Sequence, residues 1–230
     1  MNLEERTVAA IEQHPSAPQA DPGVIAALSG IAVALVGDQL RRNRGSKGLI
    51  PYHRPAPLAG TAVTVKTRGG DNLAILRAYD VCRPGDVMVV DADGCLDNAL
   101  VGGIMTFAAA SLGLAGMVLD GAIRDVAEIR ERTFPVYARG VTHRGPYKDG
   151  PGEINCAVAI DGMIVEPGDL IVADDDGVLC VPHDDAEAIC KLTEAKKATE
   201  EKAIQQILAG TSDRRWVDEA LQRLGCEFKD

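Results

Sequence analysis

The stretch Leu119–Glu128 has the sequence Leu-Asp-Gly-Ala-Ile-Arg-Asp-Val-Ala-Glu, in which an apolar strand is followed by a charged helix. This pattern places Arg124 in the first turn of that helix, where a cation opposes the helix dipole. Residues that break a local rule often mark functional sites. Glu128 is spaced to pair with Arg124 on one helix face, and Asp125 is an ordinary first-turn acid. We therefore expect a cation and a carboxylate to share one crevice.

Strand and helix patterns alternate on both sides of this stretch, which favours a parallel α/β arrangement. After Phe134 the pattern changes to short strands separated by turns such as Asp161-Gly162, which predicts a β-rich second half. The predicted strands are Ala62–Thr67, Val87–Val90, Gly116–Leu119, Val136–Ala138, Cys156–Ile160, Met163–Val165, Leu170–Ala173 and Val178–Val181. The predicted helices are Val24–Arg42, Asp71–Tyr79, Asn98–Leu112, Asp184–Leu208 and Asp213–Leu224.

Composition bounds the class of protein. The 230 residues, 46% of them hydrophobic, suffice for one domain, with or without a helical tail. The formal net charge of -10 repels nucleic-acid phosphates, so we expect no nucleic-acid partner. The longest apolar stretches are interrupted before they reach the length of a membrane span, so we expect no membrane partner, and the polar N-terminus lacks a signal-peptide core. We expect a cytoplasmic protein.

A pair of glycines, Gly102 and Gly103, opens the Ala-rich helix pattern. Glycines at this position let backbone N–H groups converge on an anion at a helix N-terminus. Taken alone, the pair is more simply explained by a tight turn or by close helix packing. The Arg124-Asp125 turn also follows an apolar strand, and parallel α/β sheets bind ligands at that edge. The two turns together indicate a site for an anionic ligand.

At this point the chain resembles the RraA-like family. The resemblance covers nearly everything after residue 20. Its most specific part is the pattern of a glycine, twenty residues, Arg-Asp, two residues and an acid, which Gly103, Arg124, Asp125 and Glu128 satisfy. The other matching segments are Gly60–Val65, Gly70-Asp71-Asn72, Pro84–Val87, Gly113, Gly116–Gly121, Gly152–Asn155, Pro167-Gly168-Asp169 and Ala173–Val178.

The resemblance implies a fold and a domain organisation. The fold is α/β: a layered α/β/β/α sandwich of the RraA-like type, with a swivelling β/β/α-type core and a C-terminal helical arm. We expect residues 1–22 to form a short helix and a loose connection. Residues 23–183 would form the core, and residues 184–230 would form the arm and contribute to oligomer contacts. The resemblance implies a homo-oligomer, either a trimer or a hexamer.

The enzymatic members of the family are class II pyruvate aldolases that act on 4-hydroxy-4-methyl-2-oxoglutarate and 4-carboxy-4-hydroxy-2-oxoadipate. Carried over by position, Asp125 would ligate Mg²⁺ or Mn²⁺ directly, and Arg124 would face the pyruvyl group. Gly102 and Gly103 would shape the substrate site, in which the backbone amides of Ile104 and Met105 bind the carboxylate of a small 2-oxo acid. A metal and an arginine both stabilise an enolate, so oxaloacetate decarboxylation is expected at the same site.

The resemblance also implies two further acidic residues in the active site. Many family aldolases carry an acid at the position of Gly103, where it holds a metal-bound water, and Asp120 on the neighbouring strand is a candidate to replace it. The enzymes also use a glutamate from the C-terminal helix of a neighbouring subunit, which fits Glu200 best and Glu201 next. The run of charges around Glu200 is equally typical of a solvated helix with exposed ion pairs.

The family also contains non-catalytic regulators that bind a ribonuclease. Those proteins lack the complete Arg-Asp-x-x-acid pattern and the extended helical arm, and both features are present here. No histidine pair has metal-ligand spacing, and the chain has no nucleophile elbow, P-loop or dinucleotide fingerprint. It also lacks a glycine-rich S-adenosylmethionine loop. The sequence therefore favours a lyase, with the protein-binding regulator as the alternative.

Overall fold

The computed structural model describes residues 11–41 and 45–226. The chain forms two compact units, which are residues 1–193 and 194–230. In the larger unit the strands are β1 (Ile11–Gln13), β2 (Ile50–Pro51), β3 (Leu58–Thr67), β4 (Asp86–Val101), β5 (Gly116–Ile123), β6 (Val136–Val141), β7 (Gly152–Ile154), β8 (Val158–Ile160), β9 (Met163–Val165), β10 (Leu170–Asp174) and β11 (Gly177–Val181). The helices are α1 (Pro22–Leu28), α2 (Val33–Gln39), α3 (Leu73–Ala78), α4 (Gly103–Ser111), α5 (Val126–Ile129), the 3-10 turn η1 (His183–Asp185) and α6 (Ala186–Leu208), followed by α7 (Arg215–Arg223).

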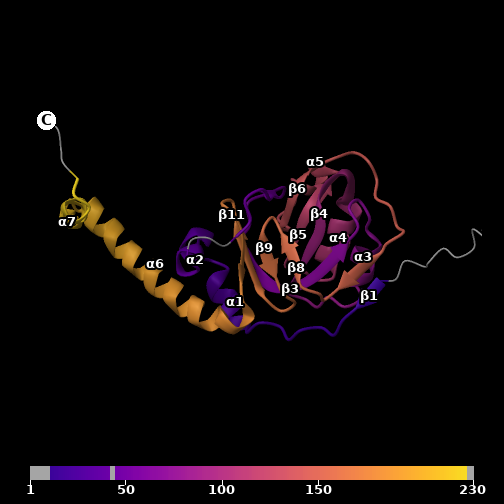
Figure 1. Ribbon diagram of the computed structural model, residues 1–230, viewed down its shortest axis with the longest axis horizontal. Coiled ribbons are helices and arrows are strands. Elements are labelled where there is room, and N and C mark those ends of the chain that lie inside the picture. Colours follow the sequence, from indigo (N-terminus) through magenta and orange to yellow (C-terminus); the bar gives the residue numbers. More distant parts are fainter. Residues whose placement is uncertain (1–10, 42–44, 227–230) are drawn as a thin grey trace, which may run out of the picture. The chain divides into compact units, whose positions relative to one another are not determined.

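The centre of the larger unit is a sheet in which β3, β4, β5 and β6 are parallel neighbours (Figure 1). Each crossover between them contains a helix, namely α3, α4 and α5 in turn. Parallel strands require such crossovers, and the helices cover the sheet face that they cross. The predicted alternation of strand and helix is confirmed.

Side chains alternate across these strands and so define two buried layers. On β4, Met88 and Val90 point toward α3, α4 and α5, whereas Val87 and Val89 point toward the opposite face. That opposite face packs against the hairpins β8–β9 and β10–β11. The outer face of β10–β11, including Leu170 and Val172, then packs against α1, α2 and the first turns of α6. The order of layers is helix, sheet, sheet, helix, which confirms the predicted α/β/β/α class.

The edges of the sheet are made by short strands. β10 and β7 both pair with β3 in the antiparallel sense, along different parts of its length. β1 pairs with β7 in parallel, and β2 pairs with β6 in antiparallel. β1 lies where the sequence predicts a short helix within residues 1–22, so that prediction is wrong for residues 11–13. Residues 1–10 lie outside the described part of the chain.

The predicted helix Val24–Arg42 is two helices. Asp21 accepts hydrogen bonds from Gly23 and Val24 and begins α1, and the backbone N–H of Val33 begins α2 by donating to Asp174 of β10. This second cap, from a strand distant in sequence, explains the break. Among the described residues no single helix has the length and apolarity to cross a membrane; α1 and α2 reach the threshold only as a pair, which is bent by 114°.

The predicted helix Asn98–Leu112 is also shorter than expected, because β4 continues to Val101. Asp93 and Gly94 have positive φ angles of 53° and 65°, and the register between β4 and β5 shifts repeatedly beyond Asp91. These bulges absorb extra residues without ending the strand. As a result β4 delivers the chain directly to Gly102 at the start of α4.

The smaller unit contains the end of α6 and all of α7. The first turns of α6 belong to the larger unit, where Ala186, Ile189 and Cys190 are buried. The predicted arm begins at residue 184, ten residues before the boundary between the two compact units. In α7 the exposed side chains include Trp216 and Arg223, and the helix has one polar face and one apolar face.

Candidate active site

A pocket of about 450 Å³ opens where β4 and β5 end. Parallel sheets commonly place ligands at this edge. Its walls come from α3, the end of β4, the first turn of α4, the segment after β5, and the loop before β7. The lining residues are Asn72, Leu76, Leu100, Val101, Gly102, Ile104, Met105, Arg124, Asp125, Gly145, Pro146 and Lys148.

The glycine pair lies where the sequence predicts, with Gly102 as the N-cap of α4 and Gly103 as its first residue. A Cβ on Gly102 would lie 2.3 Å from Oδ2 of Asp125, and a Cβ on Gly103 would lie 2.1 Å from a carboxylate oxygen of Glu128. Glycine at both positions lets these two carboxylates approach the backbone closely, and a Cβ would displace them. The next two amides, of Ile104 and Met105, are in the first turn of α4, where backbone N–H groups have no intrahelical acceptor. They are positioned to bind an anion.

Tyr79 stabilises the first turn of α4, because its hydroxyl donates a hydrogen bond to the carbonyl oxygen of Met105 across 2.9 Å. Burial, and secondarily the neighbouring Cys82, raise the pKa of Tyr79 well above its usual value. The phenol therefore remains a hydrogen-bond donor over the whole working range of pH. The first turn of α4 is anchored from inside the protein.

Arg124 and Asp125 lie together in the pocket, but not as the sequence predicts. Helix α5 begins after them, at Val126, because Asp125 is its N-cap and has left-handed backbone angles with φ of 58°. Arg124 thus precedes the helix. Its Nε lies 3.7 Å from Oδ2 of Asp125, whereas Glu128 pairs with Arg132. The predicted pairing of Arg124 with Glu128 is wrong, because that spacing requires both residues to belong to one helix.

The polar atoms of this pair are arranged to receive a ligand. Oδ2 of Asp125 accepts a hydrogen bond from the amide of Gly103 across 3.0 Å. Within the described part of the chain, the carboxylate of Asp125 accepts this one hydrogen bond, which leaves Oδ1 without one. The buried Nε of Arg124 has no hydrogen-bond partner there, although it lies within ion-pair distance of Oδ2 of Asp125. A carboxylate that lines a pocket suits a hard divalent cation. A buried donor without an acceptor suits a carboxylate or keto oxygen of a substrate.

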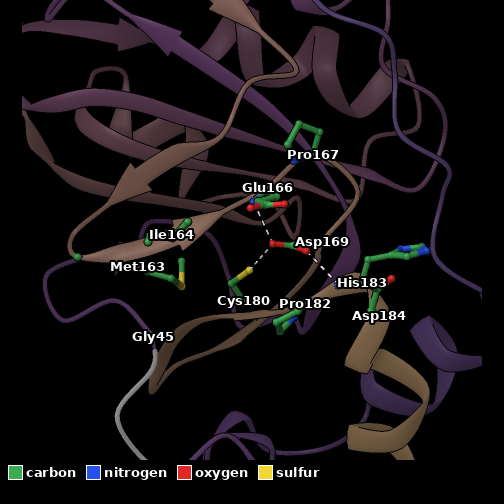
Figure 2. A pocket seen from close by; sticks show the side chains of 11 residues that line it. Gly45, Met163, Ile164, Glu166, Pro167, Asp169, Cys180, Pro182, His183 and Asp184 are labelled. Carbon is green, nitrogen blue, oxygen red and sulfur yellow. Dashed lines mark hydrogen bonds between the residues drawn. The ribbon is translucent and has the colours of Figure 1, made fainter.

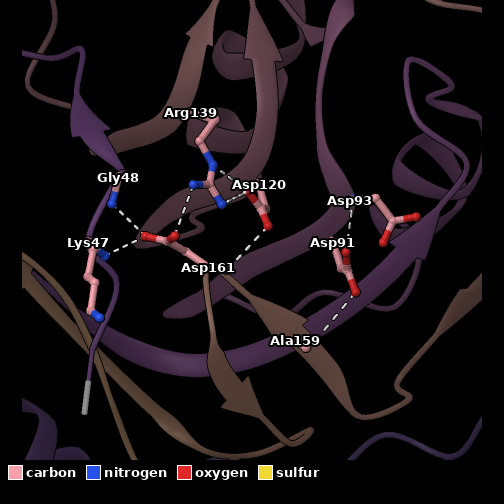
Figure 3. A network of polar contacts seen from close by, with 8 residues as sticks. All are labelled: Lys47, Gly48, Asp91, Asp93, Asp120, Arg139, Ala159 and Asp161. Atoms are coloured by element: carbon pink, nitrogen blue, oxygen red, sulfur yellow. Dashed lines mark hydrogen bonds and ion pairs between the residues drawn. The ribbon is translucent and has the colours of Figure 1, made fainter. Parts of the chain in front are cut away.

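Asp120 lies in a different environment. It shares a face of β5 with Val118, on the side of the sheet opposite α4. Its Oδ1 accepts from Nε of Arg139 across 2.8 Å, and its Oδ2 accepts from the amide of Asp161 across 3.2 Å (Figure 3). The structure therefore does not bring Asp120 together with Asp125. Because side chains alternate along a strand, Asp120 cannot take the place of an acid at position 103.

The pocket contains two side chains that the sequence analysis did not select, Asn72 and Lys148. Asn72 donates from Nδ2 to the carbonyl oxygen of Leu100 across 3.0 Å, which fixes the orientation of its amide. Its buried Oδ1 has no partner among the described residues. Gly70-Asp71-Asn72 matches the family pattern, and this match was the available signal for Asn72. No sequence pattern indicated Lys148, because its place in the pocket depends on the path of a long loop.

That loop is fixed by a buried carboxylate. Asp71 is fully buried, and its Oδ2 accepts from the amides of Asp149 and Gly150 across 2.7 and 3.0 Å. Its Oδ1 caps α3 by accepting from Leu73, and Arg68 pairs with it. Asp71 therefore positions the pocket wall that carries Lys148.

Glu200 belongs to α6 and to the smaller unit. Its carboxylate lies 3.6 Å from the ammonium of Lys196 one turn earlier, and both side chains are partly exposed. This is the intrahelical ion pair that the charge pattern also predicts. Glu201 lies in the same unit, where its neighbours Ala198, Lys202 and Gln205 form a shallow pocket.

A second pocket of about 550 Å³ lies between the β9–β10 turn and η1 (Figure 2). Its most buried carboxylate is that of Asp169, which points toward Cys180. Asp169 accepts from the thiol of Cys180 and from the amides of Glu166 and His183, at 3.2, 2.9 and 3.0 Å. These bonds join the turn to the start of the C-terminal helix. Asp169 therefore has a structural role, and the Arg124 pocket is the better candidate site.

Known proteins similar to this chain show which family it belongs to. Residues 33–180 match the family model RraA-like, described as Aldolase/RraA. A protein of Halalkalibacterium halodurans, provisionally named a 4-hydroxy-4-methyl-2-oxoglutarate aldolase, is 40% identical over 151 residues, which cover 66% of this chain and 72% of that protein. The 4-hydroxy-4-methyl-2-oxoglutarate aldolase of Thermus thermophilus is 36% identical over 113 residues, which cover 49% of this chain and 69% of that protein.

Two solved structures share the fold. An uncharacterised protein from Pseudomonas syringae superposes with a TM-score of 0.77 at 26% identity, over 86% of this chain and 94% of that one. The RNA-processing inhibitor RraA from Thermus thermophilus superposes with a TM-score of 0.61 at 30% identity, over 66% of this chain and 92% of that one. The chain belongs to the RraA-like family.

Proposed function

We propose that the protein is a divalent-metal-dependent lyase that cleaves a 4-hydroxy-2-oxo diacid to pyruvate and a second keto acid, and that it decarboxylates oxaloacetate at the same site. The observation that carries the proposal is that one pocket contains both Arg124, whose buried Nε has no hydrogen-bond partner among the described residues, and Asp125, whose carboxylate accepts a hydrogen bond there only through Oδ2. The names of the aldolase relatives support it.

Asp125 would hold the metal, which is Mg²⁺ or Mn²⁺ because its ligand here is a carboxylate oxygen. When bound, the cation supplies positive charge that stabilises the enolate formed as the carbon–carbon bond breaks. A single protein carboxylate is sufficient for Mg²⁺, which retains waters and takes further oxygens from the substrate. The hydrogen bond from Gly103 engages Oδ2 of Asp125 and leaves Oδ1 available for the metal.

The substrate carboxylate would bind the amides of Ile104 and Met105 at the N-terminus of α4. Arg124 then donates to the keto oxygen, where negative charge develops as the bond between C3 and C4 breaks. A guanidinium remains protonated at any working pH, so this stabilisation is permanent. In oxaloacetate decarboxylation the same electron pair is released as carbon dioxide leaves, and the same groups stabilise it.

Two features of the pocket support a hydroxy diacid. The ammonium of Lys148 supplies a cation, in addition to Arg124, for the distal carboxylate. The unpartnered Oδ1 of Asn72 is an acceptor for the C4 hydroxyl of the substrate. In retro-aldol cleavage that hydroxyl loses its proton as the C3–C4 bond breaks, and C3 of the pyruvate enolate gains one. A substrate with both groups satisfies both side chains.

We further propose that the protein is an obligate homo-oligomer, a trimer or a hexamer, in which Glu200 of one copy serves the site of a neighbour. Glu201 is the alternative. Replacing each glutamate by glutamine distinguishes them, because only the functional one should reduce turnover. The oligomeric state is measured by gel filtration, with activity assayed across the eluted peak. Full activity in a monomer peak would exclude this shared site.

The test of the proposal is a coupled pyruvate-release assay with oxaloacetate and several 4-hydroxy-2-oxo diacids, with Mg²⁺, with Mn²⁺ and with EDTA. We expect EDTA to stop turnover and either metal to restore it. Arg124→Ala and Asp125→Ala should each abolish metal-dependent turnover while the circular dichroism spectrum remains that of the parent. Full activity in either variant would refute this site.

A second candidate is a non-catalytic regulator that binds a ribonuclease, because the RraA neighbour of known structure is named an RNA-processing inhibitor. The two functions have different requirements. A regulator would act through its outer surface and would be indifferent to Asp125→Ala, whereas the lyase depends on it. A purified protein that releases no pyruvate from any of these substrates but retains ribonuclease inhibition in the Asp125→Ala variant would favour the regulator.

A further inference from the structure

A second group of potential metal ligands lies at the opposite edge of the sheet from β2, on β1 and β7. The side chains of Glu12, His14 and Glu153 each present a ligand atom, and these atoms all lie within 4.8 Å of one another. Nε2 of His14 is 3.8 Å from a carboxylate oxygen of Glu153. None of the three lines the pocket that contains Arg124 and Asp125.

Strand pairing fixes this arrangement. Glu12 and Glu153 are direct partners in the parallel ladder between β1 and β7. His14 is two residues beyond Glu12 and therefore points to the same face. Both backbone polar groups of His14 are engaged: its N–H donates to the carbonyl oxygen of Ile154 across 3.0 Å, and its carbonyl oxygen accepts from Nδ2 of Asn155 across 3.2 Å. The backbone that carries the imidazole is thus held against β7.

The composition of the group selects the class of metal. Two carboxylates close together repel each other, and a divalent cation between them removes that repulsion. An imidazole ligand favours zinc, nickel, cobalt or copper over magnesium, which prefers oxygen ligands alone. Ligand atoms around such an ion at about 2.0–2.2 Å are separated by roughly 3.4 Å. Glu12 is exposed, and 47% of the His14 side chain and 44% of the Glu153 side chain are exposed, so small rotations can bring the ligand atoms to that spacing.

We propose that Glu12, His14 and Glu153 form a binding site for a divalent transition metal ion that joins β1 to β7. The ion takes three protein ligands and keeps an open coordination position for water or an anion. Access is provided by an adjoining pocket of about 510 Å³, lined by Glu12 and Glu153 together with Lys66 and Arg68. Because β1 has three residues and pairs only with β7 among the described strands, the ion adds a cross-link to this edge strand.

The site can be tested independently of the lyase proposal in a protein from which other potential metal ligands have been removed. The parent for the test is tag-free, full-length protein carrying Asp125→Asn, which disables the proposed catalytic metal ligand, and Cys226→Ser, which removes an exposed thiol. Isothermal titration with Ni²⁺ is performed with excess Mg²⁺ present, which occupies oxygen-only sites. We expect one equivalent of Ni²⁺ to bind, and binding to weaken as the pH falls, because protons compete for the imidazole.

Loss of a residue that only hydrogen-bonds to a metal ligand weakens metal binding by roughly 10- to 100-fold. His14→Ala and Glu153→Gln in that parent should each weaken Ni²⁺ binding by more than this, because each removes a direct ligand. The matched control is His143→Ala, which removes another exposed histidine outside the group and should leave binding unchanged. Ni²⁺ should also raise the melting temperature of the parent and not that of His14→Ala, because a ligand of the native state stabilises it. Equal affinity in the parent and His14→Ala, absence of binding in the Asp125→Asn parent, or equal loss in His143→Ala would each overturn the proposal.

Discussion

The backbone amide of Gly103 donates a hydrogen bond to Oδ2 of Asp125 across 3.0 Å, so the first residue of α4 and the N-cap of α5 are joined directly. The two residues come from consecutive crossovers of the parallel sheet. A Cβ on Gly102 would lie 2.3 Å from the same Oδ2, so the carboxylate can occupy this position only while residue 102 has no side chain. The position of the proposed metal ligand therefore depends on Gly102, which contributes no functional group of its own.

This dependence predicts the effect of Gly102→Ala. The backbone of Gly102 is extended, with φ of -142° and ψ of -167°, so alanine is compatible with its backbone angles. The new Cβ would lie 2.3 Å from Oδ2 of Asp125 and would displace that carboxylate. We expect turnover to fall by about a hundredfold, the effect of a misplacement of about 1 Å. Pyruvate release under saturating Mg²⁺ measures it.

The matched control is Gly37→Ala in α2, where no atom lies within 4 Å of the added Cβ. There the substitution should stabilise the protein by up to about 1 kcal/mol through helix propensity and leave turnover unchanged. An equal loss of activity in both variants would show that Gly102 does not act through Asp125.

The second prediction concerns Lys148. If its ammonium binds the distal carboxylate of the substrate, Lys148→Met should reduce kcat/KM for hydroxy-oxo diacids by about 10- to 100-fold, the value of a hydrogen bond to a charged group. Pyruvate has no distal carboxylate, so exchange of its methyl protons at the same site does not need Lys148 and should be unaffected. Cleavage kinetics and proton exchange observed by NMR measure the two effects. A parallel loss in both would place Lys148 in the enolate chemistry instead.

The third prediction concerns Asp120, which the sequence resemblance places near the metal and the structure pairs with Arg139. Only 5% of the Asp120 side chain is exposed. Arg139→Met would leave a buried carboxylate without its cation, so we expect the free energy of unfolding to fall by about 3 kcal/mol. Activity per folded molecule should remain that of the parent. Urea unfolding, together with assays at a temperature where both proteins are folded, measures the two quantities.

Asp120→Asn separates the two roles of this residue. The amide preserves the shape of the side chain and loses the charge, so the structural role predicts lower stability with metal-dependent turnover intact. Unchanged stability with loss of Mg²⁺-dependent turnover would mean that Asp120 belongs to the metal site after all.

The fourth prediction is a pH dependence at Asp161, which Arg139 also binds. Desolvation of this carboxyl acts to raise its pKa, but hydrogen bonds from the amides of Lys47 and Gly48 and the charge of Arg139 outweigh it, and its pKa is lowered. A lowered native pKa contributes stability that is complete above the unfolded value of about 3.9 and is lost as the pH falls through the native value.

Asp161→Asn should therefore destabilise the protein at neutral pH, and the difference from the parent should shrink as the pH falls below about 4. Urea midpoints across this range measure the difference. A difference that stays constant down to the acid-unfolding limit would contradict the assigned cause, because it would not depend on ionisation of Asp161.

The sequence was sufficient to bring the glycine pair and the Arg124-Asp125 pair together at one edge of the sheet, because that information is local. Gly102-Gly103 and Arg124-Asp125 each stand where an apolar segment ends, and parallel strands bring such ends together. The alternation of strand and helix patterns predicted the parallel arrangement, whereas the order of the layers came from the family resemblance. By contrast, the pairing of Arg124 with Glu128 was predicted wrongly, because the left-handed conformation of Asp125 moves the start of the helix past Arg124.

The direction of Asp120 could not be predicted for a related reason. Its side depends on β5 continuing as a regular strand through Ile123, and the sequence alone suggested that the strand ends at Leu119. Lys148 could not be found either. Its place in the pocket is set by the bonds between Asp71 and the amides of Asp149 and Gly150, which join segments almost eighty residues apart.

Those bonds have a consequence for how this pocket can change in evolution. Because Asp71 binds the main chain of the loop and not its side chains, Lys148 can be exchanged without altering the path of the backbone. Lineages that keep Asp71 can acquire new substrate preferences by single replacements at this wall. Lineages that lose it would have to rebuild the whole loop before selecting a different substrate.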